Sequence, residues 1–258
     1  MTEAQNLPAP LSGRRIIVTG GASGMGAGLV RALPKLGARV VSLDRSLAGR
    51  AIADEAGAYF TAVEITDAAS VAEAVETAVG ALNGLDVLIH AAGVAPGGAA
   101  EAISLAEWDM TLTVNATGTF LINQAVFPHL REAGGAIINF VSAAGIEGYP
   151  GKAAYAAAKG AVVAWTRSIA REWAVHNIRV NAVAAAIWTP MYDATRAAMT
   201  PDQLTLHDEA MRRAIPLGGR LGDVDADFAP VIVFLASEDA RFITGQILPV
   251  DGGAIMMR

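Results

Sequence analysis

The stretch Arg15–Gly26, RIIVTGGASGMG, decides the fold of this chain because a short apolar segment runs directly into a glycine-rich turn. Residues 15–19, Arg-Ile-Ile-Val-Thr, predict a short apolar strand. The turn that follows opens a helix. A strand, a glycine turn and a helix in this order are typical of the unit that binds a phosphate at the edge of a parallel sheet.

The glycine turn is the expected site for the pyrophosphate of a dinucleotide, because glycines let phosphates approach the backbone N–H groups and the positive end of the helix. Its spacing is Gly20-x-x-x-Gly24-x-Gly26 rather than G-x-G-x-x-G. A purely structural turn is the alternative. The residues of the turn that we expect to bind the cofactor are Gly20, Ser23, Gly24, Met25 and Gly26.

Asp44 indicates which dinucleotide is preferred. It ends a second expected strand, residues 40–43, about twenty residues beyond the turn. A carboxylate there accepts hydrogen bonds from the adenosine ribose and repels a 2′-phosphate, so we expect NAD and consider NADP the weaker alternative. Arg45, the next residue, could soften this preference, and Asp44 could instead cap the following helix.

The rest of the chain alternates strands with helices, which predicts an α/β fold: a Rossmann-type, doubly wound parallel sheet with helices on both faces. We expect one domain over residues 1–258, with a loose lead-in at 1–13 and a substrate lid of one or two short helices at 187–217. Further strands are expected near 58–63, 87–90, 136–141, 178–183 and 247–250, and helices from the glycine turn to about 37 and over 46–56, 68–80, 104–132, 153–175 and 224–236.

Composition narrows the class of protein. The chain has 258 residues, of which 53% are hydrophobic, which is enough for a substantial core. A net charge of −6, without a Lys/Arg cluster, argues against nucleic-acid and anionic-membrane partners and favours a small molecule. There is no Cys, no apolar leader and no run long enough to span a bilayer, so we expect a cytoplasmic protein.

The segment 142–159, SAAGIEGYPGKAAYAAAK, carries groups suited to proton transfer. Tyr155 and Lys159 lie four residues apart in an Ala-rich run, which places them on one face of a helix. Ser142 follows the expected strand 136–141. A nearby ammonium lowers the phenol pKa from about 10 by roughly 1 to 3 units, which would make Tyr155 a usable acid or base. The alternative is a core aromatic beside a solvated lysine, because Tyr-x-x-x-Lys alone is a weak motif.

Together these motifs resemble the short-chain dehydrogenase/reductase family over nearly the whole chain. The carrying features are the turn from Thr19, Asn115 in VNATGTF, the set of Ser142, Tyr155 and Lys159, and the segment Val250-Asp-Gly-Gly253. The resemblance implies that Ser142 positions the substrate oxygen, Tyr155 transfers the proton, and Lys159 tunes Tyr155 and holds the nicotinamide ribose. It also implies that Asn115 anchors a water behind Lys159; a helix-kink residue is the alternative.

The resemblance implies further cofactor-binding residues, and at two places this chain differs from the usual sequence of the family. Glu64 and Ile65 resemble an adenine-contacting pair. Where the family usually has Asn-Asn-Ala-Gly, this chain has His90-Ala91-Ala92-Gly93, and we interpret His90 as a core residue rather than a catalyst or a metal ligand. The family's Pro-Gly after the sixth strand is also missing. The remaining expected cofactor contacts are Ala91, Gly93, Ile187 and Thr189.

The expected substrate pocket is almost entirely apolar, which suggests a hydrophobic secondary alcohol or its ketone. Some of these side chains could instead simply pack the lid onto the sheet. The pocket residues, in addition to Ser142 and Tyr155, are Val94, Ile146, Tyr149, Trp188, Met191 and Met199.

The expected helix 153–175 is apolar nearly all round, so one face should need a partner, and the family resemblance suggests a homotetramer.

Taken together, the motifs predict an NAD-dependent oxidoreductase of hydrophobic secondary alcohols and ketones. The alternatives are a 3-oxoacyl-carrier-protein reductase of the same family and a non-catalytic, nucleotide-sensing protein of the same fold.

Overall fold

The computed structural model describes residues 9–257 and confirms the predicted Rossmann-type fold. The described strands form one parallel sheet in the order β3-β2-β1-β4-β5-β6-β7. The order reverses direction between β1 and β4, which is where sheets of this kind bind ligands. The strands are β1 Arg15–Thr19, β2 Arg39–Asp44, β3 Tyr59–Ala62, β4 Val87–His90, β5 Gly135–Val141, β6 Ile178–Ala185 and β7 Ile247–Val250.

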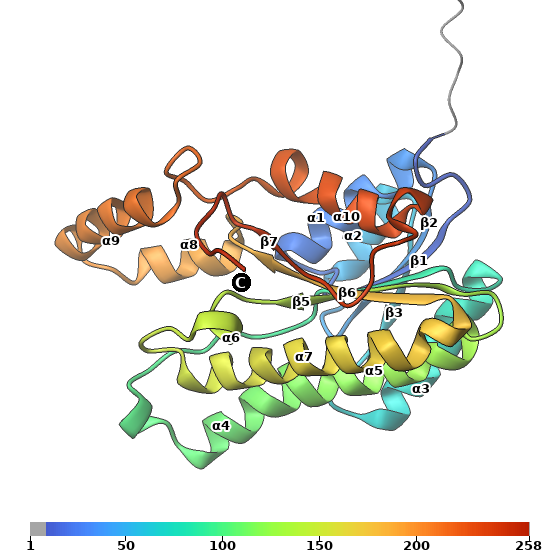
Figure 1. Cartoon of the computed structure of the whole chain (residues 1–258), viewed down its shortest axis with the longest axis horizontal. Coiled ribbons are helices and arrows are strands. Elements are labelled where there is room, and N and C mark those ends of the chain that lie inside the picture. The colour runs from blue at the N-terminus through green and yellow to red at the C-terminus, as the bar shows by residue number, and fades with distance from the viewer. Residues whose placement is uncertain (1–8, 258) are drawn as a thin grey trace, which may run out of the picture.

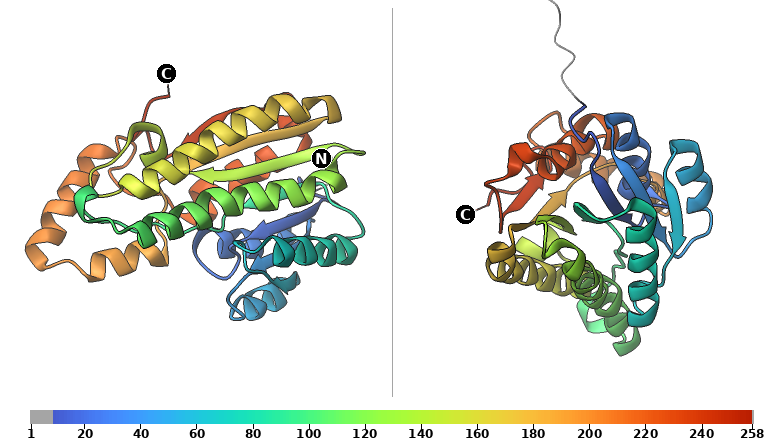
Figure 2. Two further views of the ribbon diagram at one scale, coloured as in Figure 1. Left: turned by 90° about the horizontal axis from the view of Figure 1, so that it is seen from below. Right: turned by 90° about the vertical axis from the view of Figure 1, so that its right-hand side faces the viewer.

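Helices cover both faces of the sheet (Figure 1). One face carries α1 Gly24–Ala32, α2 Gly49–Ala56 and α10 Ala229–Ala236, and the other carries α3 Ala68–Leu82, α5 Gly118–Leu130 and α7 Ala153–Glu172. The remaining helices are α4 Leu105–Leu112, α6 Ala144–Glu147, α8 Pro190–Ala197 and α9 Pro201–Ala214. Figure 2 shows α8 and α9, in orange, projecting beyond one end of the sheet.

The core lies in two layers because successive strand residues point to opposite faces. Ile16 and Val18 of β1 pack on the side of α1 and α10, whereas Ile17 packs on the side of α3 and α5. All three side chains are fully buried. Burial on both faces explains why these strands are continuous apolar runs rather than alternating ones.

Some predicted boundaries differ from the structure. The helix expected over 104–132 is interrupted by a π-helical turn, Thr113–Thr117, and Pro34 begins a short 3₁₀ turn that ends at Leu36. The prediction that residues 1–13 form a loose lead-in is wrong for the last residues of that segment. Leu11 is fully buried and its N–H donates to the Leu36 carbonyl at 3.1 Å. Residues 1–8 of that lead-in lie outside the described residues.

His90 links the carboxyl ends of the two central strands. Its Nδ1 lies 2.7 Å from Thr19 Oγ1, and that same oxygen accepts from the Ala92 N–H at 3.2 Å. The ring is buried, and Nε2 has no hydrogen-bond partner among residues 9–257. Burial, assisted by the nearby charge of Lys159, lowers the pKa of His90 to about 3. His90 is therefore a neutral core residue at neutral pH, as predicted.

This burial should make the fold sensitive to acid. Below the ordinary histidine pKa of 6.5 the unfolded chain takes up a proton that the folded chain refuses until about pH 3. Through this group the free energy of unfolding should fall by about 1.4 kcal/mol per pH unit across that window. Urea unfolding followed by circular dichroism between these pH values should show a shallower slope for His90→Asn. The control His176→Asn should keep the wild-type slope; an unchanged slope in His90→Asn would assign the acid sensitivity to another group.

Candidate active site

A groove of about 470 Å³ runs along the carboxyl ends of the central strands. It gathers residues of β2, β5, α1, α7 and α8 with residues that directly follow β1, β3 and β4, all far apart in the sequence. The predicted site residues that line it are Gly20, Ser23, Gly24, Met25, Gly26, Asp44, Glu64, Ile65, Ala91, Gly93, Val94, Asn115, Tyr155, Lys159, Thr189 and Met191.

The glycine turn brings the backbone of α1 directly against the end of β1. A Cβ atom on Gly26 would lie 2.2 Å from the Gly20 carbonyl oxygen, and one on Gly20 would lie 2.8 Å from the Ala92 nitrogen. Gly20 also has a φ of +72° and Gly24 a φ of +53°, which favour glycine. No side chain caps the start of α1. The side-chain-free cradle and the uncapped helix end fit a pyrophosphate, which would accept hydrogen bonds there.

Asp44 has two structural bonds in addition to its place in the groove. Its Oδ2 accepts from the Ala22 N–H at 3.0 Å and its Oδ1 from the Ser46 N–H at 2.8 Å. The carboxylate therefore fixes the glycine turn to the end of β2. Each oxygen has a further lone pair, which could accept from ribose hydroxyls. Arg45 also lines the groove, so a cation and an anion lie side by side at this end.

Tyr155 and Lys159 line the groove from α7, and Ser142, which is not among the lining residues, forms a side-chain hydrogen bond with Tyr155. Ser142 directly follows β5, and its Oγ accepts from the Ala144 N–H at 3.2 Å. Tyr155 and Lys159 stand one turn apart on α7. Lys159 is only 5% exposed, and its Nζ donates to the Phe140 carbonyl at 2.8 Å. The end of β5 thus supplies both the serine and the oxygen that compensates the buried ammonium.

The direction of the predicted Tyr155 pKa shift is wrong for this structure. Burial raises the pKa of Tyr155 above its ordinary value, and a hydrogen bond with Ser142 acts in the opposite direction without cancelling it. The Lys159 ammonium lies 6.0 Å from the centre of the Tyr155 ring and is bonded to Phe140 instead. Burial also lowers the pKa of Lys159 to about 8. Tyr155 therefore keeps its proton at neutral pH.

Asn115 has the structural role at a helix irregularity that we gave as the alternative to anchoring a water. It is fully buried in the π-helical turn, and its Nδ2 donates to the Val94 and Thr111 carbonyls, both at 3.0 Å. Its Oδ1 accepts from the Val94 N–H at 3.2 Å. The side-chain amide thereby holds the groove wall at Val94. Its predicted role in anchoring a water stays a prediction.

The predicted lid forms a compact cluster of its own. Trp188 and Tyr192 pack edge to face at 4.9 Å, and the Arg196 guanidinium lies 5.1 Å from the centre of the Trp188 ring. Arg196 pairs with Asp208 of α9, and the Tyr192 hydroxyl lies 2.7 Å from His207 Nε2. These contacts join α8 to α9.

Several predicted residues lie outside the groove lining. Ile187 is buried in the core, so only its backbone is available to a cofactor. Ile146 packs against the hydrophobic cluster of Val141 and Val162. Tyr149 and Trp188 are 43% and 44% exposed, and Met199 is half-buried two residues after the end of α8.

The groove also contains residues that the sequence did not single out. Leu43, Val63, Phe140 and Val141 are apolar residues at or next to strand ends, and that position could have identified them from the sequence, whereas Val114 lies in the π-helical turn. Ser46 and Pro190 carried no such signal. No group of three His, Cys, Asp or Glu side chains suited to a metal ion occurs in residues 9–257. Over the same range, no helix is long and apolar enough to cross a membrane.

Residues 20–254 match the protein family described as enoyl-(acyl carrier protein) reductase. The chain is 35% identical to the D-threitol dehydrogenase of Mycolicibacterium smegmatis, over 98% of each chain. It is also 35% identical to the 3-oxoacyl-(acyl-carrier-protein) reductase of Thermotoga maritima, covering 95% of this chain and 99% of that protein. The crystal structure of levodione reductase superposes with a TM-score of 0.87 at 30% identity, over 94% and 98% of the two chains.

These similarities cover nearly the full length of the chain and agree with its fold. The chain therefore belongs to the short-chain dehydrogenase/reductase family of oxidoreductases, whose dehydrogenases use nicotinamide cofactors.

Gly26→Ala should weaken dinucleotide binding, because its Cβ would meet the Gly20 carbonyl oxygen at 2.2 Å and push α1 away from β1. We expect the Kd for NADH, measured by fluorescence titration, to rise at least about tenfold. Gly80→Ala is the matched control: Gly80 lies on α3, and an added Cβ there meets nothing within 4 Å. Tight NADH binding by Gly26→Ala would show that this turn is not the phosphate site.

Proposed function

We propose that this protein is an NAD-dependent dehydrogenase/reductase that interconverts a hydrophobic secondary alcohol and its ketone. The observation that carries the proposal is that Tyr155 and Lys159 line the same groove as the glycine turn and that Ser142 is hydrogen-bonded to Tyr155. Bound nicotinamide would supply or accept the hydride.

The residues of the chain would manage the oxygen of the substrate. In ketone reduction, Tyr155 would donate its proton to the carbonyl oxygen, and its raised pKa keeps that proton available at neutral pH. Ser142 would hold the same oxygen through its hydroxyl. Lys159 would stabilise the phenolate that remains, with the Phe140 carbonyl fixing the ammonium. In alcohol oxidation, Tyr155 would take the proton back.

The preference for NAD is supported by the Asp44 carboxylate at the end of β2, which a 2′-phosphate would approach at an electrostatic cost. The apolar substrate is supported by Val94 and Met191 in the groove and by Trp188, which precedes the lining residue Thr189. Relatives named as dehydrogenases of D-threitol, L-fucose and trans-4-hydroxycyclohexanecarboxylate show that the family accepts alcohols of varied polarity.

The reduction of a 3-oxoacyl carrier protein is the second candidate, favoured by the Thermotoga maritima relative. The Asp44 carboxylate disfavours a cofactor with a 2′-phosphate. The net charge of −6 disfavours binding of an acidic carrier protein.

We also propose that the protein is a cytoplasmic homotetramer. On α7, Ala153, Ala157, Ala161 and Ala164 form an exposed apolar stripe. Close to it, Phe120 of α5 is 37% exposed, and its ring lies 5.4 Å from that of Trp165 on α7. A second copy would cover such a face. The absence of Cys agrees with a reducing compartment.

Tyr155→Phe should separate the enzyme from a nucleotide sensor. We expect kcat for a panel of secondary alcohols and ketones, followed by NADH absorbance, to fall about 1,000-fold because the proton donor is gone. NADH binding, followed by fluorescence, should stay within about twofold of wild type. Tyr59→Phe, at an exposed position on β3, is the control. Wild-type protein that binds NADH but turns over no member of the panel would favour the sensor.

Asp44→Asn should shift the choice of cofactor towards NADP. The amide keeps one acceptor for the turn but removes the charge that repels a 2′-phosphate, so the ratio of kcat/KM for NAD over NADP should fall about 10- to 100-fold. Asp67→Asn is the control, because Asp67 caps α3 outside the groove lining. An unchanged ratio would assign cofactor choice elsewhere, with Arg45 as the next residue to test.

A further inference from the structure

The short helix α6, which begins just after Ser142, packs backbone to backbone against α7. A Cβ atom on Gly145 of α6 would lie 2.7 Å from both the carbonyl carbon and the Cβ of Lys159, and 2.8 Å from the Gly160 nitrogen. Non-bonded heavy atoms are at their most favourable about 3.5 to 4.0 Å apart, so a side chain would force the helices apart. The backbone of Gly145 is helical, so this contact, and not an unusual conformation, requires the glycine.

Ser142 is bonded into the same turn of the chain as Gly145. Its carbonyl accepts from the Gly145 N–H at 2.9 Å, and its Oγ accepts from the Ala144 N–H at 3.2 Å. The Gly148 N–H closes the helix on the Ala144 carbonyl at 2.9 Å. A displacement of α6 would therefore carry the Ser142 hydroxyl with it.

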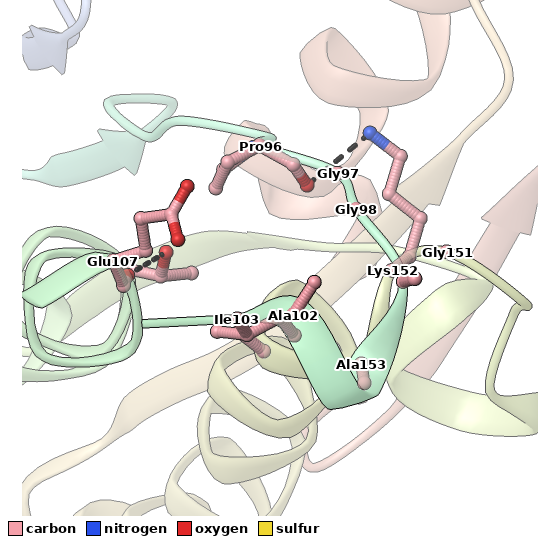
Figure 3. Close-up of a pocket in the computed structure, with 12 residues that line it drawn as sticks. Pro96, Gly97, Gly98, Ala102, Ile103, Glu107, Gly151, Lys152 and Ala153 are labelled. Atoms are coloured by element: carbon pink, nitrogen blue, oxygen red, sulfur yellow. Dashed lines mark hydrogen bonds between the residues drawn. The ribbon is translucent and has the colours of Figure 1, made fainter. Parts of the chain in front are cut away.

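The helix α7 is anchored independently of α6. At its start, the Lys152 Nζ donates to the Ala95 carbonyl at 2.8 Å and to the Pro96 carbonyl at 3.3 Å, and Figure 3 shows the second of these bonds. Further along, the Lys159 Nζ donates to the Phe140 carbonyl at 2.8 Å. Because these bonds hold α7 to the loop after β4 and to β5, a side chain added between the two helices would move α6 rather than α7.

The distance between α6 and α7 decides whether Ser142 reaches Tyr155. The two side chains are hydrogen-bonded, and this bond lowers the pKa of Tyr155 against the larger, opposite effect of burial. Tyr155 lies one turn before Lys159, the residue that a Cβ on Gly145 would meet. An O–H···O bond spans about 2.5 to 3.0 Å, so a shift of α6 by about 1 Å would break it.

We infer that Gly145 is a positioning residue for the proposed reaction: it lets α6 rest on the backbone of α7 and thereby holds the Ser142 hydroxyl at that of Tyr155. This inference rests on the proposed oxidoreductase function, in which both hydroxyls meet the oxygen of the substrate. Gly145 is not among the residues that line the groove, so its effect passes through Ser142.

Gly145→Ala tests the inference through kcat. We expect kcat for ketone reduction to fall about 10- to 100-fold, because the Ser142 hydroxyl no longer holds the substrate oxygen beside the proton donor. KM for the nicotinamide cofactor should stay within about twofold of wild type. Gly160→Ala is the matched control and should keep kcat within about twofold, since its Cβ meets only the Gly145 carbonyl oxygen, at 3.4 Å.

A double-mutant cycle separates positioning from a general loosening of the fold. Once Ser142 is replaced in Ser142→Ala, the position of that residue no longer matters, so adding Gly145→Ala should lower kcat by about twofold at most. Losses that multiply would overturn the inference. Wild-type kcat in Gly145→Ala, or an equal loss in Gly160→Ala, would overturn it as well.

Crystal structures test the same inference without activity. Gly145→Ala should show α6 displaced, α7 in place, and the Ser142 hydroxyl beyond hydrogen-bond distance of the Tyr155 hydroxyl; an intact bond overturns the inference. If wild type turns over no alcohol or ketone but this displacement is seen, the proposed function fails and the positioning of Ser142 by Gly145 stands.

Gly160→Val keeps the inference testable if Gly145→Ala does not fold. Its larger side chain presses on the Gly145 carbonyl from the side of α7, so it should displace α6 and lower kcat, again with little further effect in Ser142→Ala. Wild-type kcat in Gly160→Val would contradict the inference.

Discussion

The contact of Gly26 with the carbonyl of Gly20 is the constraint on which the groove depends. Without side chains on either residue, α1 begins directly against the end of β1, and its first N–H groups face the crevice where the strand order reverses. Asp44 extends this arrangement to the next strand, because one carboxylate accepts from both Ala22 and Ser46. The position of the glycine turn and the position of the segment after β2 are therefore coupled through a single carboxylate.

On the other side of the groove, the end of β5 positions the side chains of the predicted proton-transfer site. It delivers Ser142 and, one residue before the strand's last position, the Phe140 carbonyl that holds Lys159. Burying an ammonium is expensive unless hydrogen bonds replace its hydration. The same bond that lowers this cost also draws Nζ towards the sheet, which leaves the Tyr155 phenol to burial and Ser142. The backbone at the ends of β2 and β5 thus fixes the positions of two charged groups, the Asp44 carboxylate and the Lys159 ammonium.

The fold could be predicted from the sequence because its strands are apolar runs closed by recognisable turns. The predicted groove residues either follow a strand, as Gly20 and Ala91 do, or share one face of a helix, as Tyr155 and Lys159 do. What could not be predicted depends on packing between distant segments. Burial raises the pKa of Tyr155, and Leu11 is buried in the core with its N–H donating to the Leu36 carbonyl. In the π-helical turn, the Asn115 amide donates to the Val94 and Thr111 carbonyls. No local pattern encodes these contacts.

The cluster that joins α8 to α9 has a consequence for how molecules enter the groove. Arg196 with Asp208, and Tyr192 with His207, satisfy one another within the two helices rather than against the sheet. The two helices are therefore tied to one another, and we expect a displacement of one to carry the other with it. The segment after α9 is anchored instead: Ile215 is buried, and the Leu217 N–H donates to the Gly252 carbonyl at 2.8 Å.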